Sequence, residues 1–97
     1  MTTVQVTGNK DWRAGFNVRG EYKLYGEKNG RPIYKRVSGR DMFIYWFSDT
    51  RKWGWYIGWD TNGHYSAFNE SDSETPPEAG WSNLNGNAPK LRVRITE

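Results

Sequence analysis

Apolar and polar residues alternate along much of this chain, with a period of two residues. Near the C-terminus, Leu91, Val93 and Ile95 alternate with polar and charged residues, and Val4 and Val6 do the same near the N-terminus. A period of two places successive side chains on opposite faces of a strand, whereas a helix needs an apolar stripe with a period of about 3.6 residues. No such stripe is sustained here, so the sequence predicts an all-β fold.

Turn-forming dipeptides separate the strand-like segments. Asn29-Gly30 and Asn62-Gly63 each lie between two of them, and Asn-Gly favours a two-residue hairpin because a type I′ turn needs positive φ at both central positions. The predicted fold is an antiparallel meander of about six to eight short strands, arranged as a small sandwich or a partly closed barrel. The strands are expected near residues 3–7, 20–26, 31–37, 42–48, 52–60, 64–69 and 90–96.

The segment 70–89 interrupts the alternation with an irregular, acidic, proline-rich sequence that includes Thr75-Pro76-Pro77. We expect a long loop within a single domain spanning residues 1–97. Burial of Trp81 would anchor this loop to the sheet. The last strand would then return to pair near the first, which would protect the sheet edges.

Aromatic residues replace the usual aliphatic core. Phe, Trp and Tyr make up 16% of the chain, with six Trp, six Tyr and four Phe, and large rings bury much area per residue. The chain contains no cysteine, which excludes disulfides and Cys-ligated zinc and favours a reducing compartment such as the cytoplasm. Neither a signal peptide nor a membrane-spanning run is expected from the sequence, and the location is left unassigned.

The net charge of +3 is distributed unevenly. Residues 1–58 carry +6, residues 59–89 carry −5 and residues 90–97 carry +2. The cations are scattered singly, so a mixed solvated surface is favoured and nucleic acid is a disfavoured partner.

Residues that could support catalysis are scarce. His64 is the single histidine, so a Cys–His pair or a histidine-rich metal site cannot form, and a solvated turn residue is the favoured interpretation. No nucleophile elbow, P-loop or dinucleotide-binding glycine motif is present. A calcium site formed by Asp60, Glu70 and Asp72 is the weaker alternative to solvated loop charges. We expect a protein that is not an enzyme and has no cofactor or metal.

The aromatic strands provide the candidate binding residues, with two interpretations open. In one, every ring is structural, and the proline-rich loop with Trp81 covers the second face of the sheet. In the other, Tyr56 and Trp46, with Trp59 or Trp81, form a partly exposed shelf. Such a shelf suits a protein or peptide partner first and a carbohydrate second, because the side chains of Asp60 and Asn62 could bond to sugar hydroxyls. Self-association is a further possibility.

The order of several motifs resembles a known kind of module. NGRPIYK occupies residues 29–35, an aromatic strand follows at 43–47, and Glu74-Thr75-Pro76-Pro77 precedes Gly80-Trp81. Over residues 18–94 this order resembles an aromatic-rich β module, with NGRPxYK and ETPP-x-x-GW motifs, that recurs, often in tandem, in long and mostly uncharacterised eukaryotic proteins. The resemblance implies an interaction module or structural repeat unit without catalytic residues. A lectin-like carbohydrate-binding domain is the alternative.

Overall fold

The computed structural model describes residues 2–8, 18–28, 30–49, 53–63, 65–83, 86–87 and 91–96. Every regular element in these ranges is a β-strand, so the predicted all-β fold is confirmed. The strands are β1 (Thr3–Thr7), β2 (Gly20–Lys28), β3 (Arg31–Arg36), β4 (Phe43–Ser48), β5 (Trp53–Gly58), β6 (Ala67–Asn69), β7 (Ser82–Asn83), β8 (Gly86–Asn87) and β9 (Arg92–Thr96). The part of the chain that the structure describes holds no helix suited to crossing a bilayer.

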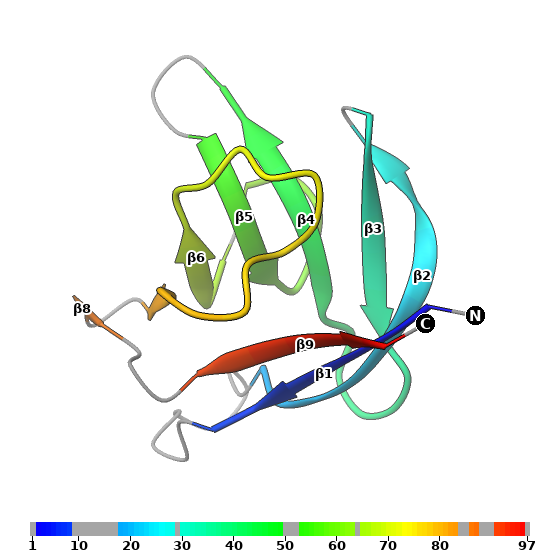
Figure 1. Cartoon of the computed structure of the whole chain (residues 1–97). Helices are drawn as coiled ribbons and strands as arrows, with labels where there is room; N and C mark the ends of the chain where they lie inside the picture. The colour runs from blue at the N-terminus through cyan, green and yellow to red at the C-terminus, as the bar shows by residue number, and fades with distance from the viewer. Residues whose placement is uncertain are drawn as a thin grey trace.

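One antiparallel sheet contains all of these strands, in the order β8-β7-β6-β5-β4-β3-β2-β1-β9. Consecutive strands are neighbours from β1 to β8, and the last strand returns to pair with the first, as expected. Figure 1 shows β9 and β1 running across the lower ends of β3, β4 and β5, so that the sheet curls into a half-barrel. Of the two predicted shapes, the partly closed barrel is the one that forms.

Two strand predictions need correction. The strand expected at 64–69 begins only at Ala67, because Tyr65 turns its ring onto Tyr56 and belongs to the preceding connection. His64 lies outside the described residues. The loop expected at 70–89 contains β7 and β8, each of two residues. The burial of Trp81 places the residues that follow it beside β6.

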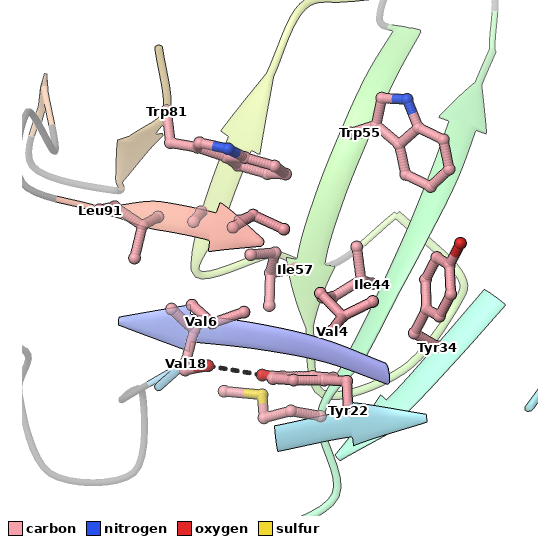
Figure 2. Close-up of a cluster of buried hydrophobic side chains, with 13 residues drawn as sticks. Val4, Val6, Val18, Tyr22, Tyr34, Ile44, Trp55, Ile57, Trp81 and Leu91 are labelled. Atoms are coloured by element: carbon pink, nitrogen blue, oxygen red, sulfur yellow. Dashed lines mark hydrogen bonds between the residues drawn. The ribbon is translucent and has the colours of Figure 1, made fainter. Parts of the chain in front are cut away.

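The main core fills the concave side of the curled sheet (Figure 2). Figure 2 shows Ile57, Val4 and Val6 pointing into one space, with the Trp81 ring above them. Alternate positions of the long strands supply most of this core, which is why the period of two was visible in the sequence. Its buried members are Val4, Val6, Val18, Tyr22, Tyr34, Met42, Ile44, Trp55, Ile57, Ala67, Trp81, Leu91 and Val93.

Tryptophan side chains bind the segment 70–81 to the core side of the sheet. Three indole N–H groups donate to its main-chain carbonyls at 2.8–3.0 Å: Trp46 to Ser71, Trp55 to Ser73 and Trp81 to Pro77. Trp81 is also buried in the core. The predicted anchoring of this loop by Trp81 is therefore confirmed.

The same loop helps to close the half-barrel. The N–H of Val93, on the side of β9 away from β1, donates to the carbonyl of Glu78 at 3.0 Å. The loop and Trp81 thus lie with the main core. The expectation that they cover the second face of the sheet is wrong, because the side chains that bind the loop point to the concave side.

A second apolar cluster lies on the opposite, convex face of β3 to β6. Its buried members are Ile33, Tyr45 and Tyr56, and partly buried rings surround them. The connection between β5 and β6 covers this cluster: the N–H of Gly63 donates to the Tyr45 hydroxyl at 3.0 Å. Lys28 Nζ donates to the carbonyl of Thr61 in the same connection at 2.6 Å. Most of the described aromatic rings are therefore structural. The convex cluster is covered by the connection between β5 and β6 rather than by the predicted proline-rich loop.

Candidate functional site

Trp46 and Tyr56, the centre of the predicted aromatic shelf, lie on opposite faces of the sheet. Trp46 is opposite Trp55 on the core side, whereas Tyr56 is opposite Tyr45 on the convex side. Tyr56 is only 2% exposed, and burial raises its pKa above the ordinary range of tyrosine. The predicted shelf is therefore wrong in its geometry, because the two residues occupy alternate positions of paired strands.

Of the other predicted site residues, Trp81 is buried, whereas Trp59, Asp60 and Asn62 lie in a surface segment. Trp81 is 2% exposed and serves the core. Trp59, in contrast, is 38% exposed and directly precedes a turn in which the Asp60 carboxylate accepts the N–H of Asn62 at 2.9 Å. Trp59, Asp60 and Asn62 thus belong to one surface segment of the chain, and their role in binding stays a prediction.

Trp46 is covered by a cation. The guanidinium carbon of Arg31 lies 4.0 Å from the centre of the Trp46 ring, and such stacking is attractive. The same guanidinium donates to the carbonyls of Asp72 and Ser73 at 2.8 and 3.2 Å. Trp46 is therefore part of the attachment of the acidic loop.

The alternative calcium site does not form. Among the described residues, no three His, Asp or Glu side chains lie close enough to share an ion. The Asp60 carboxylate accepts a bond within its own turn, while Glu70 and Asp72 are exposed.

Among the described residues, one half of β2 has a strand along only one of its sides. This strand spans Gly20–Lys28, but β1 pairs only with residues 20–23. Residues 24–28 pair with β3 on one side, and no other strand of the described chain runs along their second side. Figure 1 shows this half of β2 at the outside of the sheet, beyond the point where β1 begins.

A β-bulge lies within this open stretch. The register with β3 shifts between Leu24 and Gly26, which leaves Tyr25 without an opposite residue. Leu24 and Tyr25 are 56% and 61% exposed, the highest values among the large apolar side chains described. A shallow hollow of about 500 Å³ adjoins them and is lined also by Glu27 and Pro32. Bulges often redirect side chains beside binding sites.

Positive charge lies next to the open stretch on the convex face. Lys23 and Lys35 are directly opposite each other on β2 and β3. Lys35 Nζ lies 5.2 Å from the centre of the Tyr25 ring and 5.8 Å from that of Phe43, and the two rings meet edge to face at 5.6 Å. The Asp41 carboxylate lies 3.9 Å from Lys35 Nζ. A basic, aromatic surface therefore borders the edge.

Sequence reasoning did not single out Leu24, Tyr25, Lys23 or Lys35. No residue pattern in the sequence indicates the bulge that follows Leu24. The one available signal was length, because the segment around β2 is longer than the one around β1.

Comparison with protein-family models, with curated proteins and with solved structures finds no match. The resemblance to the aromatic-rich β module stays a prediction.

Proposed function

We propose that this protein is a non-catalytic interaction module that binds an extended segment of a partner protein along residues 24–28 of β2. One observation carries the proposal: within the described part of the chain this stretch has a strand neighbour on one side only, and it presents the exposed side chains of Leu24 and Tyr25. An open edge offers main-chain donors and acceptors to an added strand. In strand addition, main-chain bonds provide affinity and the flanking side chains provide specificity.

Other margins of the sheet are less suited to this role. The outer side of β9 already bonds to Glu78 through the N–H of Val93. At the opposite margin, β8 has two residues, too few for a stable added strand. The ends of β3 and β4 diverge after their short pairing, and Arg31 bridges to the acidic loop there. The free half of β2 is the stretch that combines length, exposure and apolar side chains.

A selection experiment tests the proposal. A random peptide library displayed on phage is selected against the purified domain, and the recovered peptides are titrated against variants. Tyr25→Ser should weaken their binding about tenfold or more, the loss expected for an exposed ring at the centre of an interface. Trp53→Ser is the matched control, since Trp53 is also an exposed ring, 45% accessible, but lies on β5. Peptides insensitive to Tyr25→Ser would contradict the proposal.

A carbohydrate site at Trp59 is the second candidate. The exposed Trp59 directly precedes the turn that contains Asp60 and Asn62, and sugars stack on exposed rings while neighbouring polar groups bond to their hydroxyls. A glycan array probed with the protein and with Trp59→Ala tests this alternative. Binding to a glycan that is lost in Trp59→Ala would support it, and no binding to the array would count against it.

A further inference from the structure

We infer that the partner segment at β2 is acidic, with a carboxylate side chain held by Lys23 and Lys35 on the convex face. This inference rests on the proposed function, because it specifies the chemistry of the strand that residues 24–28 would accept. It depends on three features of this surface: the direction in which the two lysines project, the position of the Lys35 ammonium group, and the excess of cations over carboxylates on the convex face.

The pairing of the strands sets the direction of the lysines. Residues directly opposite each other in a sheet project from the same face. One such row crosses five strands of this sheet: Thr96, Thr3, Lys23, Lys35 and Phe43. The residues that alternate with this row, such as Val4 and Tyr22, belong to the main core. Both lysines therefore project from the convex face, away from the core.

The ammonium group of Lys35 lies between two rings on the convex face. Its Nζ is 5.2 Å from the centre of the Tyr25 ring on β2 and 5.8 Å from that of the Phe43 ring on β4. A strand added beside β2 would lie about 4.8 Å from it. A glutamate or aspartate side chain on the convex side of that strand could then reach Lys23 directly and Lys35 beside the Tyr25 ring.

Cations outnumber carboxylates on this part of the convex face. The register shows which side chains of β9, β1, β2 and β3 project outward. Four of them are basic: Arg92 and Arg94 on β9, Lys23 on β2 and Lys35 on β3. Glu21 is the acidic residue in the same positions, and it accepts a hydrogen bond from Gln5 at 3.0 Å. Asp41 forms an ion pair with Lys35 at 3.9 Å, and the Asp41 side chain is largely exposed, so this pair is a weak one. Like charges directly opposite each other are unfavourable, so an incoming carboxylate would relieve the repulsion between Lys23 and Lys35.

The convex face beside the open edge is basic, whereas the opposite face is apolar, and this difference predicts a sequence pattern for the partner strand. An added strand would direct alternate side chains to the convex face and to the face that carries Leu24. The first set would meet the lysines, and the second would meet Leu24 and the hollow beside Pro32. The preferred partner is thus a strand in which acidic and apolar residues alternate. A nucleic acid could use the lysines, but it has no peptide backbone with which to extend the ladder of hydrogen bonds along β2.

Labelled hexapeptides test this inference by fluorescence anisotropy. The probes are Ac-EVEVEV-NH2, Ac-QVQVQV-NH2 and Ac-KVKVKV-NH2, with an oligothymidine as the nucleic-acid probe. We expect the acidic peptide to bind about tenfold more tightly than the glutamine peptide, which is the effect of two surface ion pairs. Lys23→Gln and Lys35→Gln should each weaken the acidic peptide about threefold and leave the glutamine peptide unchanged. High salt should remove the difference between the two peptides.

Arg94→Gln is the matched control. It removes the same charge from the same face but lies two strands, about 10 Å, from Lys23, so binding should change less than twofold. Equal affinity for the acidic and glutamine peptides would overturn the acidic preference and leave strand addition in place. Binding by none of the peptides would overturn both proposals. Tighter binding of the oligothymidine than of the acidic peptide, with loss in both lysine variants, would assign the lysines to nucleic acid instead.

Discussion

Single side chains in this protein often serve both the core and a loop. The ring of Trp81 is buried among the residues of the main core, while its indole N–H bonds to the carbonyl of Pro77 at 2.8 Å. Trp55 combines a buried ring with a bond to Ser73 in the same way. Such residues couple the conformation of segment 70–81 to the stability of the half-barrel.

Truncation of Trp81 tests this coupling. Trp81→Ala should lower the free energy of unfolding by about 3–5 kcal/mol, because it leaves a large cavity in the core and removes the anchor of the loop. Trp53→Ala, at a ring that is 45% exposed, should cost less than about 1 kcal/mol. Guanidinium denaturation followed by circular dichroism measures both. Equal losses in the two variants would contradict the core position of Trp81.

The burial of the Tyr22 hydroxyl should make the folded protein less stable at alkaline pH. Its hydroxyl donates to the carbonyl of Val18 at 2.7 Å, and burial raises its pKa well above the ordinary value. The folded state therefore holds Tyr22 neutral, and the stability from this group is full below the unfolded pKa of about 10 and falls as the pH rises above it. At about pH 11 the loss should be roughly 1.4 kcal/mol for this residue.

Guanidinium midpoints between about pH 8 and pH 11 measure the effect of Tyr22. Tyr22→Phe should be less stable at neutral pH, because the carbonyl of Val18 loses its donor. Its stability should also fall less steeply at high pH than that of the unchanged protein. An identical alkaline fall in both proteins would show that Tyr22 does not carry the dependence.

At the scale of elements, β5 and β6 approach each other closely at Gly54. This residue has a φ of 141°, and a Cβ added there would collide with the carbonyl oxygen of Asn69 and lie 3.0 Å from the Cα of Glu70. Both neighbours are main chain and cannot rotate away. Gly26, in the bulge of β2, has open space around the same position.

Alanine at the two glycines should therefore have very different effects. Gly54→Ala should destabilise the fold by about 2–4 kcal/mol, through strain at positive φ and overlap with the β6 backbone. Gly26→Ala should stay within about 1 kcal/mol of the unchanged protein. Thermal denaturation of the two variants measures the difference, and a neutral Gly54→Ala would show that β5 and β6 are farther apart than the structure places them.

The strands and their order in the sheet were largely predictable, whereas the extent of each pairing was not. Alternation placed β1 at its observed bounds and β2 to β5 within about two residues. Alternation reports which face a residue occupies, but not how far two strands run together. It therefore could not show that β1 begins beside Lys23, nor that Tyr25 forms a bulge. The two-residue strands β7 and β8 are too short to carry a period.

At the scale of the whole molecule, the curl of the sheet determines what is exposed. The main core needs side chains from both ends of the sheet, from Val4 on β1 to Ala67 on β6. Closing these ends together buries Trp81 and leaves the far half of β2 on the outside. Sequence reasoning could not locate the candidate site, because the sequence does not show which aromatic rings are buried and which are exposed. That difference depends on how the sheet curls.

The most direct test of the account is an isotope-filtered NOESY spectrum of the labelled domain with unlabelled Ac-EVEVEV-NH2. Strand addition predicts cross-strand contacts between amide and Hα protons of the peptide and those of residues 24–28, at the spacing of neighbouring strands. Contacts of the peptide to Leu24 on one face and to Lys23 on the other should accompany them. A bound peptide with contacts only to side chains elsewhere, such as Trp59, would contradict the assignment of β2 as the binding edge.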